Sequence, residues 1–202
     1  MSVLKNKRGQ SKLEFYNNAM NLSTDITLCL MTNFGVTLKT SSGGKQAIAK
    51  EDGEEVILGE HPEWLLNRFR NKIMTLVENL LSNITAGNSI YPTSMEDPKT
   101  PNAPKLPEQY IRRVQCDELA DRRRYQTAAI GNCYQLIESL QYFTRVFSRK
   151  FDTFKVSINK IIPFIDALHF EIRLLKGWRK QTNDLAKKLL KGELKGKVLE
   201  SK

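Results

Sequence analysis

The residue types that most often carry catalysis or hold metals are few in this sequence and lie far apart. The two histidines, His61 and His169, have no patterned cysteine or acidic partners nearby. No H-E-x-x-H, Glu-x-x-His or Ser-His-Asp arrangement is supported by the spacing. Residues 41–45, S-S-G-G-K, lack the spacing of a phosphate-binding loop. We therefore predict a protein that is not an enzyme and that uses no cofactor or metal.

The cysteines and the hydropathy pattern indicate the kind of environment in which the protein resides. Cys29, Cys116 and Cys133 are odd in number and lie within helical patterns, so we interpret them as buried small hydrophobes. The basic N-terminal residues are not followed by the apolar segment of a secretory signal. No apolar run approaches the roughly 20 residues that a membrane-spanning helix needs. These observations predict a soluble, cytoplasmic protein.

The charge balance indicates a polyanionic partner. The 202 residues include 32 Lys and Arg against 22 Asp and Glu, a formal net charge of +10. A surplus of this kind favours nucleic acid first and a membrane surface second. The apolar residues after residue 180 include no aromatic anchor, so membrane binding is the weaker interpretation.

Basic residues gather in two stretches. Residues 112–124 contain five arginines, more than the neighbouring acids neutralise, and 174–180 read L-L-K-G-W-R-K, which suits phosphate contact with base stacking. Two alternatives stay open: Trp178 closes the end of a helix bundle, or the arginines pair with Glu118 and Asp121 one turn back. We predict nucleic-acid binding by Arg112, Arg113, Arg122, Arg123, Arg124, Arg173, Lys176, Trp178, Arg179, Lys180, Lys187 and Lys188.

Helical periodicity defines the elements that position these residues. Apolar residues recur every three or four positions within 11–35, 62–86, 107–147 and 154–175. The first range opens with a capping box, Ser11 and Glu14, and ends at Gly35. Pro163 predicts a bend near residues 159–163. A last short helix is expected over 183–191.

The pattern as a whole predicts an all-α fold, an antiparallel four-helix bundle over residues 11–180. A basic arm precedes it at 1–10, and a basic segment follows at 181–202. The bundle contains a long insertion at 37–60, with one β-like run at 55–58 and a small hairpin around 51–54, and a proline-rich connection at 87–107. Apolar residues beyond one stripe, including Trp64, Leu66, Tyr134 and Tyr142, predict a homo-oligomer.

Four segments resemble a known family. Residues 11–35, 86–92 (A-G-N-S-I-Y-P), 122–141 and 174–180 are similar to the accessory variability determinant (Avd) proteins of bacterial diversity-generating retroelements. The resemblance touches all four expected helices. It implies a basic four-helix bundle, related to proteins encoded in ribosomal RNA intervening sequences, that assembles as a pentamer and has no active site.

The resemblance also implies partners. Members of this family act with a reverse transcriptase and its template-repeat RNA, and the complex makes cDNA that is mutated mainly at adenines. On this basis we expect an accessory protein of mutagenic retrohoming that binds the reverse transcriptase, the RNA and the cDNA. The alternative is an RNA-binding protein of the ribosomal intervening-sequence type without a polymerase partner.

Overall fold

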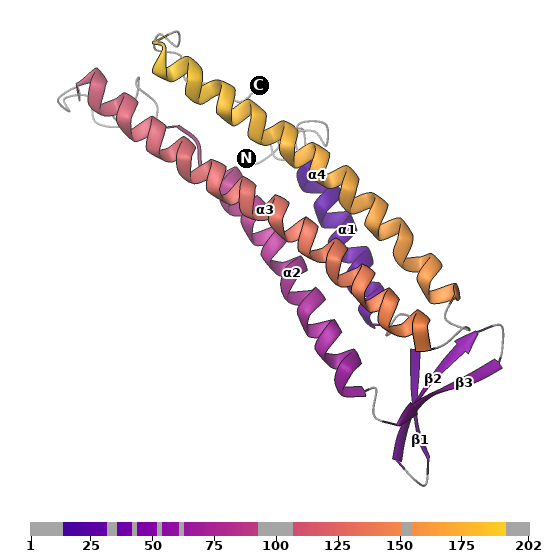
Figure 1. Ribbon diagram of the computed structural model, residues 1–202. Coiled ribbons are helices and arrows are strands. Elements are labelled where there is room, and N and C mark those ends of the chain that lie inside the picture. The colour runs from indigo at the N-terminus through magenta and orange to yellow at the C-terminus, as the bar shows by residue number, and fades with distance from the viewer. Residues whose placement is uncertain are drawn as a thin grey trace, which may run out of the picture.

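Four helices make up most of the described chain. The computed structural model describes residues 14–31, 36–41, 44–51, 54–60, 63–92, 107–150 and 155–192, with the backbone alone for the strands and for 63–66, 146–150 and 155–160. The helices are α1 (Glu14–Met31), α2 (Glu63–Ser89), α3 (Glu108–Lys150) and α4 (Lys155–Leu190). They pack lengthwise against one another (Figure 1). The prediction of four mutually packed helices is confirmed.

The large core lies between these helices and is nearly all apolar. Phe69 near the start of α2 meets Phe143 late in α3 edge to face, with ring centroids 5.3 Å apart. Of the apolar stripe predicted for the long helix, the members from Leu119 to Phe143 are buried, because their steps keep them on one side of α3. Ile111 and Val114 are half-buried. Side chains with almost no exposure in this core are Ile26, Ile73, Leu80, Ile84, Leu136, Leu140, Phe143 and Ile161.

A second, smaller core joins α3 and α4 alone. It consists of Leu119, Ala186 and Leu189, with Leu185 packed against it. In Figure 1 both helices extend beyond the ends of α1 and α2. We call residues 108–121 of α3 and 183–190 of α4 the two-helix extension. Among the described residues, the apolar core of this extension is made by side chains of α3 and α4.

The segment between α1 and α2 differs from our expectation. It forms a three-stranded antiparallel sheet, β1 (Val36–Ser41), β2 (Gly44–Glu51) and β3 (Glu54–Glu60), in the order β1-β2-β3. We expected one β-like run and a small hairpin. The hairpin exists, since Glu51 pairs with Glu54 across Asp52-Gly53, a residue pair that favours two-residue turns. The first strand was missed because only two apolar residues, Val36 and Leu38, alternate with polar ones in it, too few to give a strong period.

The last helix is also longer than the sequence indicated. α4 continues through Pro163 and through residues 183–190, which we expected as a separate short helix. It ends at Leu190, and Gly192 follows with a φ of 68°, in the left-handed region that glycine adopts at little cost. The amide N–H of Gly192 donates to the carbonyl of Leu189, 3.1 Å away, and so closes the last turn.

Several sequence predictions fall outside the described residues. These are the capping residue Ser11, the cap at Gly35, the arm at 1–10, most of the proline-rich connection and the tail from 193 onward. No helix in the described part of the chain is both long and apolar enough to cross a bilayer.

Candidate nucleic-acid interface

Three side-chain hydrogen bonds align α3 with α4 and bring the two predicted basic stretches side by side. Lys176 donates to the Tyr134 hydroxyl over 2.9 Å, and Arg179 to Thr127 over 3.3 Å. Farther along, buried Gln126 donates to Thr182 over 2.8 Å. Residue numbers fall along α3 as they rise along α4, so the arginines at 112–124 lie alongside the C-terminal half of α4.

The C-terminal half of α4 carries one continuous basic stripe. The interval 173–191 holds seven Lys or Arg residues and one carboxylate, Asp184. Five of the seven follow one another at steps of three, four and seven, which places them on one side of the helix. Lys176 belongs to this set and bonds to Tyr134, so this side borders α3. The stripe consists of the exposed residues Arg173, Lys176, Lys180, Lys187 and Lys191.

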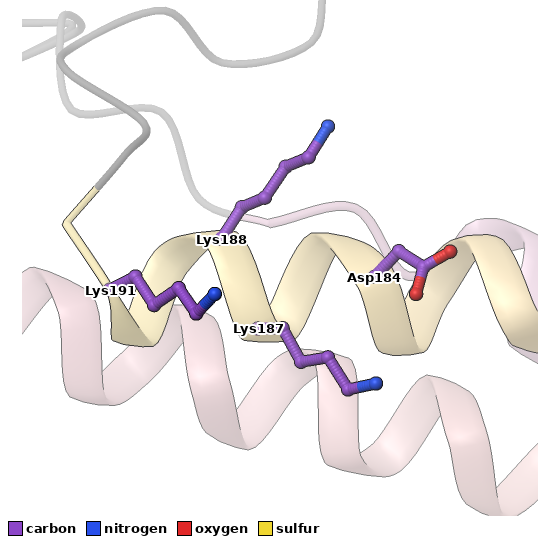
Figure 2. A pocket seen from close by; sticks show the side chains of 4 residues that line it. All are labelled: Asp184, Lys187, Lys188 and Lys191. Carbon is purple, nitrogen blue, oxygen red and sulfur yellow. The ribbon is translucent and has the colours of Figure 1, made fainter.

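The end of the stripe encloses a hollow on the surface of α4. It is lined by Asp184, Lys187, Lys188 and Lys191 (Figure 2). In Figure 2 Lys188 extends to one side of the helix while Lys187 extends to the other. Lys188 therefore adds charge to the surface without belonging to the stripe. Three ammonium groups beside one carboxylate make this hollow attractive to an anion.

Trp178 is not available for base stacking, which corrects our prediction for this residue. Its side chain is only 5% exposed. The indole stacks on Phe15 of α1, with ring centroids 4.3 Å apart and planes inclined by 15°. Gly87 of α2 allows this packing, because a Cβ there would lie 3.0 Å from the indole and 3.2 Å from Tyr125. The alternative interpretation, that Trp178 closes the bundle, holds.

Arg122 belongs to the same packed cluster. Its guanidinium carbon lies 5.4 Å from the Trp178 ring centroid and 5.5 Å from that of Tyr91. Burial lowers the pKa of Arg122, and the interaction with Tyr91 opposes this shift. Its Nε is buried without a hydrogen-bond partner. The side chain is thus engaged with aromatic rings, and the structure assigns it a packing role that sequence reasoning did not foresee.

Four other arginines of α3 were predicted to bind nucleic acid, and they differ in exposure and in pairing. Arg112 pairs with Glu108 one turn back, and Arg124 lies 3.6 Å from Asp121. For the arginines at 122–124 our alternative was an ion pair with an acid one turn back, and Arg124 makes such a pair. Both partners of that pair are more than half exposed, so the contact contributes little and leaves the cation accessible. Arg113 is exposed and Arg123 is half-buried.

The residues with catalytic or metal-binding potential are dispersed in the described structure. Cys133 is buried and Cys29 and Cys116 are half-buried, and none of the three is in a disulfide. Burial, with a contribution from nearby Glu171, raises the pKa of Cys133, which keeps it a thiol. No group of three or more potential ligands that could hold a metal occurs among the described residues. His169 is exposed, and His61 lies outside the described part.

A buried carboxylate on α4 was missed by sequence reasoning. Glu171 has no exposed surface, and one of its oxygens accepts a hydrogen bond from Asn18 of α1 over 2.7 Å. The other oxygen has no partner. The pKa of Glu171 is raised to about 7, mainly by burial. The hydrogen bond from Asn18 lowers this pKa, and the negative charge of Glu14 raises it. The signal in the sequence was its position between apolar residues 168 and 172 on the core side of the helix.

Comparison with protein-family models, curated proteins and solved structures gives no match for this chain.

Proposed function

We propose that this chain is a non-catalytic, RNA-binding accessory protein of a diversity-generating retroelement. In this role it binds the reverse transcriptase and the template-repeat RNA in the cytoplasm and supports synthesis of cDNA mutated at adenines. The observation that carries RNA binding is the basic stripe on α4, beside the exposed arginines of α3. The retroelement part rests on the resemblance of residues 11–35, 86–92, 122–141 and 174–180 to the Avd proteins.

The stripe suits a nucleic-acid backbone for an electrostatic reason. Each phosphate that a cation neutralises releases condensed counterions, so affinity falls steeply as salt rises. Contacts to phosphate hold the strand without reading its sequence. We therefore expect broad binding of RNA by the isolated protein, with selectivity supplied by the polymerase and by the fold of the RNA.

We further propose that the helices form an antiparallel four-helix bundle that assembles as a pentamer. The assembly rests on the family resemblance and on exposed apolar side chains. Tyr134 and Tyr142 are 47% and 59% exposed. Tyr134 is bonded to a cation of the stripe, so we assign the assembly surface to the side of α3 that carries Tyr142. The side chains of Trp64 and Leu66, also named for this role, lie outside the described part. A monomer in light scattering at micromolar concentration contradicts this proposal.

RNA binding is tested with two double variants, each of which removes two positive charges, one from α4 and the other from α2. Lys180→Gln with Lys187→Gln removes two cations from the stripe, and we expect the log–log salt slope for single-stranded RNA to shrink by roughly 0.7 per lost contact. Arg68→Gln with Lys72→Gln removes two exposed cations from α2 and is the matched control. Filter binding at several salt concentrations measures both. Equal slopes for the two double variants overturn the assignment to α4.

The polymerase partnership needs a separate experiment. cDNA synthesis by a retroelement reverse transcriptase on its template-repeat RNA is measured with and without this protein, and the products are sequenced. Stimulated synthesis with adenine-directed mutations is expected. RNA binding without any effect on the polymerase favours the ribosomal intervening-sequence type of protein.

A further inference from the structure

A second feature of the α3–α4 surface is a small open site between two cation–hydroxyl bonds. Thr127, Gly131 and Tyr134 follow one another along α3 at steps of four and three, which places them on neighbouring turns. The bonds from Arg179 to Thr127 and from Lys176 to Tyr134 lie at the two ends of this row. Gly131 lies between them. We call these five residues the notch.

The floor of the notch is open. A Cβ built on Gly131 would have no heavy atom within 4 Å. A long side chain on a helix normally covers the turn before its own Cα, so Tyr134 would be expected to shield Gly131. No atom of Tyr134 lies within 4 Å of that Cβ, so the ring does not cover Gly131. The surface beside the tyrosine ring is therefore accessible from solvent.

The fold itself does not require glycine at this position. Gly87 is needed because a Cβ would press on Trp178, whereas Gly131 has room for a side chain. Glycine inside a helix is less favourable than alanine, because it loses more conformational freedom on folding. Openness alone does not make a site, since Gly177 on α4 is equally unobstructed. What distinguishes Gly131 is its place between two cations and beside an exposed ring.

The Tyr134 ring is held but not covered. The Lys176 ammonium nitrogen is 2.9 Å from the hydroxyl oxygen and 5.4 Å from the ring centroid. The ammonium is much nearer to the hydroxyl oxygen than to the ring centroid, so it lies beyond the hydroxyl edge of the ring and not above the centre of its face. A flat group can then stack on the face of the ring.

The charges around the notch favour a phosphate at one end. The acceptors that Lys176 and Arg179 have in the described structure are neutral hydroxyls. At Arg179 a phosphate offers a stronger, charge-assisted hydrogen bond than the Thr127 hydroxyl does. Glu138, exposed one turn beyond Tyr134, repels an anion from the far end. The phosphate therefore belongs at the Arg179 end and the base at the tyrosine.

We infer that the notch is a subsite for one nucleotide of single-stranded RNA. Its base stacks on Tyr134 over Gly131, its phosphate binds Arg179, and Lys176 keeps its bond to the Tyr134 hydroxyl while adding positive charge to the notch. The inference rests on the proposed RNA binding and adds to it a contact that depends on the base, which the basic stripe alone does not provide. Stacking on an aromatic side chain accepts any base, in keeping with broad binding.

The test separates base stacking from charge. Fluorescence anisotropy compares oligo-U RNA with a ribose-phosphate oligomer of equal length that lacks bases. Tyr134→Ala should weaken oligo-U binding at least about fivefold. It should leave the abasic oligomer and the salt slope unchanged, while Tyr134→Phe should retain most of the affinity. Lys176→Gln should flatten the salt slope for both ligands.

Two glycine variants serve as a matched pair. Gly131→Leu fills the notch and should weaken oligo-U binding, whereas Gly177→Leu, at the other unobstructed helical glycine, should not. Circular dichroism checks that both variants remain helical. Unchanged oligo-U binding by Tyr134→Ala and Gly131→Leu, or equal loss on the abasic oligomer, overturns the subsite and leaves the basic stripe intact. Failure of the native protein to bind either oligomer overturns the proposed function and the subsite together.

Discussion

Helices α3 and α4 run through two regions of the molecule. In the four-helix region they share a core with α1 and α2, and in the two-helix extension they share a small core with each other. In the four-helix region the apolar faces of α3 and α4 are enclosed by α1 and α2, and even Arg122 is drawn into an aromatic cluster with Trp178 and Tyr91. In the extension three buried residues make up the core, and the cations around it stay exposed.

This difference shows that depth of burial decides what a cation can do. A guanidinium between two rings loses water and gains packing, so it stabilises the fold and is not free to neutralise phosphate. An ammonium on the outer side of a helix, as along the basic stripe, keeps its water and its long-range field. The three predictions that follow compare buried with exposed positions, from the largest expected effect to the smallest.

The largest effect concerns the two cores. Trp178→Ala should lower the free energy of unfolding by about 3–5 kcal/mol, because it removes a large buried ring that α1, α2 and α3 all contact. Leu189→Ala should cost about 2 kcal/mol, since the smaller core can partly collapse. Chemical denaturation followed by circular dichroism measures both. Leu190→Ala, at a site 75% exposed, is the control and should be close to neutral.

Equal losses for Trp178→Ala and Leu189→Ala would falsify the distinction between a deep core and a shallow one. The result would mean that the extension contributes as much to stability as the four-helix region.

The second effect is a dependence of stability on pH through Glu171. Its pKa is raised to about 7 in the folded protein, above the roughly 4.3 of an unfolded glutamate. The folded state therefore holds a proton that the unfolded state has lost between these values, so this group makes stability fall as pH rises from about 4 to 7. The full penalty, about 4 kcal/mol, persists at higher pH.

Glu171→Gln keeps an acceptor for Asn18 and removes the titration. Relative to the native protein the variant should gain melting temperature at pH 8 and gain little at pH 5. Glu138→Gln, which alters an exposed carboxylate on α3, is the control and should show no such difference. A Glu171→Gln advantage that is the same at both pH values would show that the carboxylate is already ionised in the fold.

The smallest effect compares two arginines of the same triplet. Arg122→Ala should cost about 1–2 kcal/mol of stability, because it removes cation–π contacts to Trp178 and Tyr91 in a largely desolvated position. Arg124→Ala should change stability by less than about 0.5 kcal/mol, since its ion pair with Asp121 is exposed. In RNA binding the order should reverse, with the larger decrease in salt slope for Arg124→Ala.

A flatter salt slope for Arg122→Ala at unchanged stability would contradict the packing role. This comparison also shows why replacing residues 122–124 together is a poor test of RNA binding. Loss of Arg122 disturbs the fold at the same time as loss of Arg124 removes an accessible charge.

Much of the helical framework was predictable because long helices repeat their signal many times. The apolar stripe from Leu119 to Phe143 spans several turns, and all its members are buried. The short strands of the segment after α1 carry too few positions for such a signal, and their pairing is a contact between segments. The continuity of α4 was missed because basic residues interrupt the row of buried positions Thr182, Ala186 and Leu189, which contact α3.

The candidate site was predicted in outline, and the roles of individual residues were not. Composition and spacing indicated that residues 173–188 and 112–124 are basic, and those residues do line paired helices. Nothing in the spacing separated Arg122 from Arg124, or Trp178 from an exposed aromatic. Tyr134 was noted as an apolar residue in excess of one stripe, and its bond to Lys176 depends on how two helices are aligned.

The sequence by itself determined the positive charge, the four helices and the apolar face of each, because these depend on residue type and on a local period of 3.6. Only the tertiary structure decided which cations are buried and which remain in water. That outcome depends on the length over which α1 and α2 cover α3 and α4. It also depends on one close approach at Gly87, where the absence of a side chain lets Trp178 and Tyr125 close over the end of the core.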